Sequence, residues 1–155
     1  MPDGAFLVDS NIFIRWVKPD DRDYPLLNGL IEGLIRRGSS LCYTSQNLAE
    51  FWNTCTRPTE RNGYGLSVED ADGRAAVIED SLNLLADSLA VHREWRKLIV
   101  ASRVSGVQVH DARLVAAMHV HGIQRILTFN DRDFARYTTV KAWHPQSLSP
   151  RLGSI

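Results

Sequence analysis

Acidic side chains stand at four places in this chain where a short apolar stretch ends or where a helix is expected. Asp9 follows the apolar run AFLV, Glu50 lies within SQNLAEFW, and Asp111 opens the run DARLVAAM. A fourth segment, ILTFNDRDF, carries Asp131 and Asp133. Clustered carboxylates repel one another, and a hard divalent ion such as Mg²⁺ or Mn²⁺ relieves that repulsion by binding their oxygens.

A bound ion of this kind would suit an enzyme that hydrolyses phosphodiester bonds. It can lower the pKa of a bound water and neutralise charge in the transition state, and a second ion can stabilise the leaving oxygen. The sequence leaves open whether one ion or two would bind. It has no GxSxG, P-loop or GxGxxG motif that would indicate a different chemistry.

Each acid also has a simpler interpretation, in which it only stabilises a helix. Asp9 could cap the helix that follows it, and Asp111, Asp131 and Asp133 could be first-turn acids that favour the helix dipole. Glu50 could lie on an exposed helix face. These separate interpretations do not predict the order in which the acids occur on one fold.

The elements that must position these acids alternate between short strands and longer helices. Strands are predicted at 5–8, 41–44, 82–85, 125–129 and 140–143. Helices are predicted at 11–16, 24–37, 45–55, 67–80, 88–104 and 110–121, with Ser45 and Ser67 as N-caps and a helical turn at 131–137. This pattern predicts an α/β fold of three layers, α/β/α, with a central, mostly parallel sheet of four to five short strands flanked by helices. Such sheets bind ligands at the carboxyl ends of their strands.

Length and composition predict one globular domain. The chain has 155 residues, 44% of them hydrophobic, so we expect a single domain over 1–146 and a flexible C-terminal tail over 147–155. No apolar run is long enough to span a bilayer and no signal peptide is visible, so a cytoplasmic location and no membrane partner are expected. The net charge of zero argues against a broad basic face for nucleic acid, although an enzyme can still grip a few phosphates locally. Cys42 and Cys55 are expected to be reduced, buried thiols.

Taken in order, the four segments resemble those of PIN-domain ribonucleases, and among them the VapC-type toxins of toxin–antitoxin pairs. LVDSN at 7–11 is similar to the opening strand and acid of that family, and SQNLAEF at 45–51 to the helix with its second acid. The helix from Asp111 to Ala117 is similar to the third motif. LTFN with the later Asp133-Phe134 is similar to the closing motif. The resemblance covers the chain from Leu7 to about Pro145.

The resemblance implies a PIN-like fold and a toxin endoribonuclease that cuts RNA with Mg²⁺ or Mn²⁺, forms a homodimer and is inhibited by a small antitoxin. It implies that Asp9, Glu50 and Asp111 bind the metal and that Asp133 completes the catalytic set. Asn11, Thr128 and Asn130 would position substrate or water. The family commonly has an acid where Asn130 stands, so Asn130, Asp131 and Asp133 remain alternatives for the fourth position.

Other functions are compatible with parts of the pattern. A housekeeping PIN nuclease would have the same acids, whereas a PIN fold that only binds RNA or protein would be expected to lose some of them. A haloacid dehalogenase-type phosphatase would need a second aspartate where Asn11 stands. For a partner protein, helices 11–16 and 24–37 could present an apolar groove that includes Trp16, unless both helices are used in core and homodimer contacts.

Overall fold

A five-stranded parallel sheet forms the centre of the molecule in a computed structural model that describes residues 4–153, with side chains described up to residue 149. The strands are β1 (Ala5–Val8), β2 (Ser40–Thr44), β3 (Asn83–Leu85), β4 (Arg125–Leu127) and β5 (Lys141–Trp143). Their order across the sheet is β3-β2-β1-β4-β5, and every pair is parallel. The predicted α/β/α fold class is therefore confirmed.

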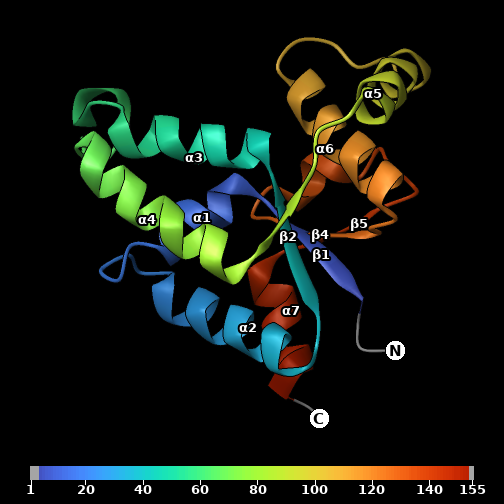
Figure 1. Cartoon of the computed structure of the whole chain (residues 1–155). Helices are drawn as coiled ribbons and strands as arrows, with labels where there is room; N and C mark the ends of the chain where they lie inside the picture. Colours follow the sequence, from blue (N-terminus) through green and yellow to red (C-terminus); the bar gives the residue numbers. More distant parts are fainter. Residues whose placement is uncertain (1–3, 154–155) are drawn as a thin grey trace.

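Helices cover both faces of the sheet (Figure 1). They are α1 (Ser10–Trp16), α2 (Tyr24–Arg36), α3 (Ser45–Thr56), α4 (Val68–Ser81), α5 (Leu89–Ala101), α6 (Gln108–His121) and α7 (Pro145–Gly153), with short 3-10 turns η1 (Thr59–Arg61) and η2 (Asp131–Phe134). One core packs α1 to α4 and α7 against side chains such as Phe6 and Val8 of β1. A second packs α5 and α6 against Leu7 of β1 and Ile126 of β4. Successive β1 side chains thus enter opposite cores, as the two-residue repeat of a strand requires.

The chain reverses its direction of travel across the sheet at β1 and β4. From β1 it moves outward to β2 and β3, and it then returns to the other side of β1 to form β4 and β5. Leu7 pairs with Ile126 and Val8 with Leu127, so β1 and β4 end at the same level. A crevice at such a switch point is where parallel sheets bind ligands.

Several local expectations differ from the structure. The strand predicted at 125–129 ends at Leu127, and the helix predicted at 88–104 ends at Ala101. Thr44, not Ser45, caps α3, because its hydroxyl accepts the backbone N–H of Asn47. The segment expected as a flexible tail instead forms α7 as far as Gly153, and Leu148 is 6% exposed where α7 meets α2. The polar, proline-containing sequence of that segment suggested a flexible tail, although one of its leucines is buried. Residues 154–155 lie outside the described part of the chain.

The proposed apolar groove between the first two helices is mostly filled by the protein itself. Ile12 and Phe13 of α1 and Leu27, Leu30 and Ile31 of α2 are buried in the first core. Trp16 is half-buried and donates its indole N–H to the Asn28 side chain at 3.3 Å. Most apolar side chains of α1 and α2 are therefore used in the core, which was the alternative to a groove for a partner.

None of the helices in the described range is long and apolar enough to cross a membrane. Cys42 and Cys55 are buried free thiols, as expected. Burial raises the pKa of both thiols and keeps them protonated.

Candidate active site

Asp9 lies at the carboxyl end of β1, directly before α1. Its backbone N–H donates to the Leu127 carbonyl of β4 at 3.0 Å, which extends the pairing of the two strands by one residue. Its side chain is 5% exposed; one oxygen accepts the Ser10 N–H at 2.8 Å and the other accepts the Thr128 hydroxyl at 2.8 Å. Asp9 therefore caps α1, and its carboxylate is held rigidly at the switch point.

Burial is the largest influence on the Asp9 carboxyl. It raises the pKa, and the negative charge of Glu50 raises it further, whereas the hydrogen bonds from Thr128 and Ser10 lower it. The net direction is upward, so the charged form is disfavoured in the protein alone. A cation beside Asp9 would reverse this effect.

Glu50 reaches the same place from α3. The capping box between Thr44 and Asn47 starts this helix at the end of β2. Glu50 lies on the second turn, where one carboxylate oxygen accepts the Ser10 hydroxyl at 2.7 Å and the other accepts the Gln46 amide at 2.9 Å. Ser10 thus joins Glu50 to the segment that carries Asp9.

Asp111 faces these acids from the first turn of α6. The start of α6 is fixed by α5, because the Trp95 indole donates to the Val109 carbonyl at 2.9 Å. Burial and, after it, the negative charges of Asp9, Asp133 and Glu50 together raise the pKa of Asp111 to about 6. Four carboxylates from separate parts of the sequence therefore share one electrostatic environment.

The loop after β4 closes the site. Thr128 is fully buried, and its hydroxyl donates to Asp9 while accepting the side-chain amide of Asn11 at 3.3 Å and the backbone N–H of Asn130 at 3.0 Å. Asn11 also accepts the Phe129 N–H at 3.3 Å. These bonds tie the loop to α1 and position Asp133 close enough to act on Asp111.

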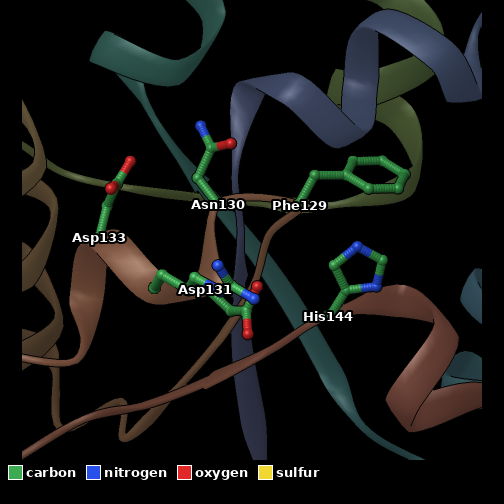
Figure 2. Close-up of a pocket in the computed structure, with 6 residues that line it drawn as sticks. Phe129, Asn130, Asp131, Asp133 and His144 are labelled. Atoms are coloured by element: carbon green, nitrogen blue, oxygen red, sulfur yellow. The ribbon is translucent and has the colours of Figure 1, made fainter.

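The three alternatives for the fourth position differ in their surroundings. Asp133 is among the charges that raise the pKa of Asp111, and Asp131 is not. Asn130 has an exposed side chain, and Figure 2 shows its amide on the loop between Phe129 and Asp131. Of the two acids on this loop, Asp133 is the one whose charge raises the pKa of Asp111.

A family model for the PIN domain matches residues 6–140, which include all four acids. This chain belongs to the PIN domain family. Comparison with curated proteins gives no significant match.

Solved structures with the same fold include complexes whose names contain VapBC. The DNA-bound VapBC of Salmonella typhimurium has 14% identity and a TM-score of 0.69, covering 91% of this PIN domain chain and 98% of that one. VapBC2 of Rickettsia felis, bound to a promoter DNA fragment, has 14% identity and a TM-score of 0.68, with 90% and 98% covered. VapC20 of Mycobacterium tuberculosis, a toxin that cleaves the sarcin–ricin loop, has 18% identity and a TM-score of 0.60, with 88% and 98% covered. At these identities the likeness establishes the fold.

Two polar residues of this PIN domain site escaped the sequence analysis. Ser10 links Asp9 to Glu50, and Gln46 links Glu50 to α6 by also donating to the His110 carbonyl at 2.9 Å. Only a weak signal for Gln46 exists in the sequence, its spacing of four residues from Glu50, which places both on one helix face. Ser10 has no such signal, because its role depends on where α3 packs.

The donor set of this PIN domain is suited to a hard cation held partly through water. No three His, Cys, Asp or Glu side chains within the described residues stand close enough together to bind one ion directly. Mg²⁺ commonly keeps several waters and uses only one or two carboxylates. The Gln46 side-chain oxygen is buried without a hydrogen-bond donor, so it could accept a bond from such a water. The acids and this oxygen fit an ion of that kind.

Proposed function

We propose that this PIN domain is a metal-dependent endoribonuclease and the toxin of a toxin–antitoxin pair. The observation that carries the proposal is the cluster of Asp9, Glu50 and Asp133 around Asp111, whose pKa rises to about 6. A protein gains nothing in stability from four acids that repel one another, so their grouping supports a role in binding a cation. PIN domains of the VapC type are nucleases, so the cation would take part in phosphodiester hydrolysis.

Within this proposal each residue has a separate role. Asp9 and Asp111 would hold Mg²⁺ or Mn²⁺, in part through its waters, while Glu50 would bind the ion through water or orient that water. A bound ion of this kind would supply a more acidic water and neutralise charge on the phosphodiester. Asp133 completes the acidic set. The positioning residues are Asn11, Thr128 and Asn130.

The Thr128 hydroxyl supports a positioning role by its bonding. It donates to one Asp9 oxygen, which leaves the lone pairs of that oxygen on the side away from Thr128 for a ligand. Asn11 uses both its amide nitrogen and its oxygen to hold the closing loop. These bonds fix the loop before any substrate binds. Substrate binding therefore has a smaller free-energy cost for ordering the loop.

The toxin part of the proposal draws on the neighbouring structures. Several of them are named as VapBC or toxin–antitoxin complexes, so we propose a small antitoxin as partner, together with homodimer formation and action on RNA in the cytoplasm. A housekeeping nuclease would need no inhibitor, and expression would not stop growth.

Expression of the chain alone in a bacterial host tests this function. Growth should stop, RNA fragments should accumulate, and co-expression of the protein encoded by the adjacent gene should restore growth. The variant Asp9→Asn should not stop growth, whereas Asp72→Asn on an exposed turn of α4 should act as the wild type. Normal growth and intact RNA with well-expressed wild-type protein would refute the toxin function.

A further inference from the structure

A cavity of about 390 Å³ lies beside the acid cluster, and its walls differ chemically from the cluster itself. It is lined by Phe129, Asn130, Asp131, Arg132, Asp133 and His144 (Figure 2). Asp133 belongs to both places, because its charge raises the pKa of Asp111. Part of an RNA chain whose phosphate lies at the acids would therefore extend into this cavity. The inference below rests on the proposed nuclease function.

One wall of the cavity is aromatic. The rings of Phe129 and His144 meet edge to face, with centroids 5.3 Å apart and planes at 85°. The Arg15 guanidinium lies 4.5 Å from the centre of the Phe129 ring and donates to the Asn11 carbonyl at 2.8 Å. Aromatic and histidine rings of this kind are the surfaces on which proteins stack unpaired RNA bases.

His144 offers a hydrogen-bond donor. Its Nδ1 accepts the backbone N–H of Gln146 at 3.1 Å, so the neutral ring carries its proton on Nε2. The structure gives Nε2 no protein acceptor within the described side chains. A ligand carbonyl or ring nitrogen in the cavity can therefore accept this proton in a hydrogen bond.

Asp131 offers two acceptors. Its side chain is half-buried, and no side-chain or backbone donor in the part of the chain whose side chains are described bonds to its carboxylate. The acid is also outside the group that acts on Asp111. A half-buried carboxylate without a donor is stabilised by a ligand that brings N–H groups.

We infer that this cavity binds a guanine base of the RNA next to the bond that is cut. Guanine is the base whose Watson–Crick edge carries two adjacent N–H donors, N1–H and the N2 amino group, and one carboxylate can accept both. Adenine and cytosine offer one amino group beside an acceptor nitrogen, which a carboxylate repels. Asp131 accepts the two guanine donors, the His144 Nε2–H donates to guanine O6 or N7, and the Phe129 ring stacks on the base.

The position of the cavity beside the acid cluster favours a guanine that is part of an RNA chain. A free guanosine monophosphate carries the base but lacks the adjoining nucleotide whose phosphodiester would lie at the acids, so it should bind more weakly than an RNA chain. The cavity is therefore a subsite for a base within a chain and not for a free nucleotide.

Binding of short RNAs tests the inference directly. Fluorescently labelled hexamers of uridine with one central guanosine, inosine or adenosine should be titrated, in the presence of Mg²⁺, with full-length protein carrying Asp9→Asn so that the RNA stays intact. Inosine lacks the N2 amino group and should bind about fivefold or more weakly than guanosine, and adenosine about tenfold or more weakly. Adding Asp131→Asn should reduce both differences to less than about twofold, because an amide presents a donor to N1–H. The matched change Asp72→Asn should leave both differences intact, and His144→Ala should weaken binding of all three RNAs.

Equal binding of the three RNAs, or discrimination that survives Asp131→Asn in a protein that unfolds at the same temperature, would overturn the inference. So would competition by guanosine monophosphate at the same concentration as the guanosine hexamer. Cleavage by the wild type is measured separately with the same RNAs. Guanine-selective binding without cleavage would support the guanine subsite and refute the nuclease function. Cleavage without guanine selection would support the nuclease function and refute the guanine subsite.

Discussion

At the scale of one residue, Asp111 shows that the surroundings of the site disfavour a charged carboxylate. Its carboxyl sits in the first turn of α6, where a helix dipole favours an acid, yet burial and three other carboxylates raise its pKa to about 6. The sequence correctly placed Asp111 in the first turn of a helix, where an acid favours the helix dipole. It did not show that other carboxylates surround this residue. Those surroundings depend on residues that are distant along the chain.

This raised pKa predicts a pH-dependent stability in the absence of divalent ions. A carboxyl whose pKa rises from 3.8 to about 6 on folding binds its proton more tightly in the folded chain, so its effect on the free energy of unfolding becomes less favourable as the pH rises from about 4 to about 6. Because the side chain is partly open to water, the penalty at neutral pH is on the order of 1 kcal/mol after screening. Asp111→Asn should therefore be more stable than the wild type at pH 7.5, and this advantage should shrink at pH 4.5.

Urea unfolding in EDTA at the two pH values measures this difference, with Asp72→Asn as a control for the same chemical change on an exposed helix face. An advantage of Asp111→Asn that is the same at both pH values would show that the charge of Asp111 is not responsible.

The two acids of the closing loop should separate in their effects. Asp133 acts on Asp111 whereas Asp131 does not, so Asp133→Asn should raise the Mg²⁺ concentration needed for half-maximal cleavage by about tenfold, and Asp131→Asn should shift it little. Mg²⁺ titrations of the two variants on one RNA compare them. A larger shift for Asp131→Asn would reverse the assignment.

At the scale of elements, the sequence indicates which segments carry the acids but not how their ends are fastened. The apolar runs predicted all five strands, and the spacing of leucines predicted α2. The capping box of Thr44 and the bonds of Thr128 became visible only in the structure, because each joins groups whose proximity depends on the backbone path. Ser10 and Gln46 were missed for the same reason.

Thr128 gives the prediction for this scale. Thr128→Val keeps the size of the side chain but leaves Asp9 and the Asn130 N–H without their bonds to the hydroxyl, so the free energy of unfolding should fall by about 1–3 kcal/mol. Cleavage should fall as well, because the Asp9 carboxylate and the closing loop lose their fixed positions. Thr138→Val, at an exposed position of the loop before β5, is the matched control. Thermal unfolding and RNA cleavage that match the control would show that the hydroxyl does not position the site.

At the scale of the whole molecule, the sheet order brings four separate segments to the same end of the sheet. Alternating strands and helices predict a parallel sheet, yet the placement of β4 beside β1 depends on pairing between residues more than 100 positions apart, which local patterns do not encode. The same limit applies to α7. Its sequence is too polar and too short to predict a helix, and its stability comes from packing on α2.

Leu148 tests whether α7 belongs to the folded domain. Its side chain is 6% exposed, so Leu148→Ala should lower the free energy of unfolding by about 2–3 kcal/mol. Leu84→Ala removes the same atoms from a leucine that is 54% exposed and should have a much smaller effect. Equal effects of the two changes in urea unfolding would return this segment to the flexible tail that the sequence suggested.

Cleavage of a defined single-stranded RNA by purified protein tests the central claim that the clustered acids use a divalent ion to hydrolyse RNA. The wild type should cut in Mg²⁺, stop in excess EDTA and resume when Mg²⁺ is restored. Asp9→Asn should be slower by a factor on the order of 100 or more while remaining at least as thermally stable, and Asp72→Asn should match the wild type. Undiminished cleavage in EDTA, or by Asp9→Asn, would contradict the account.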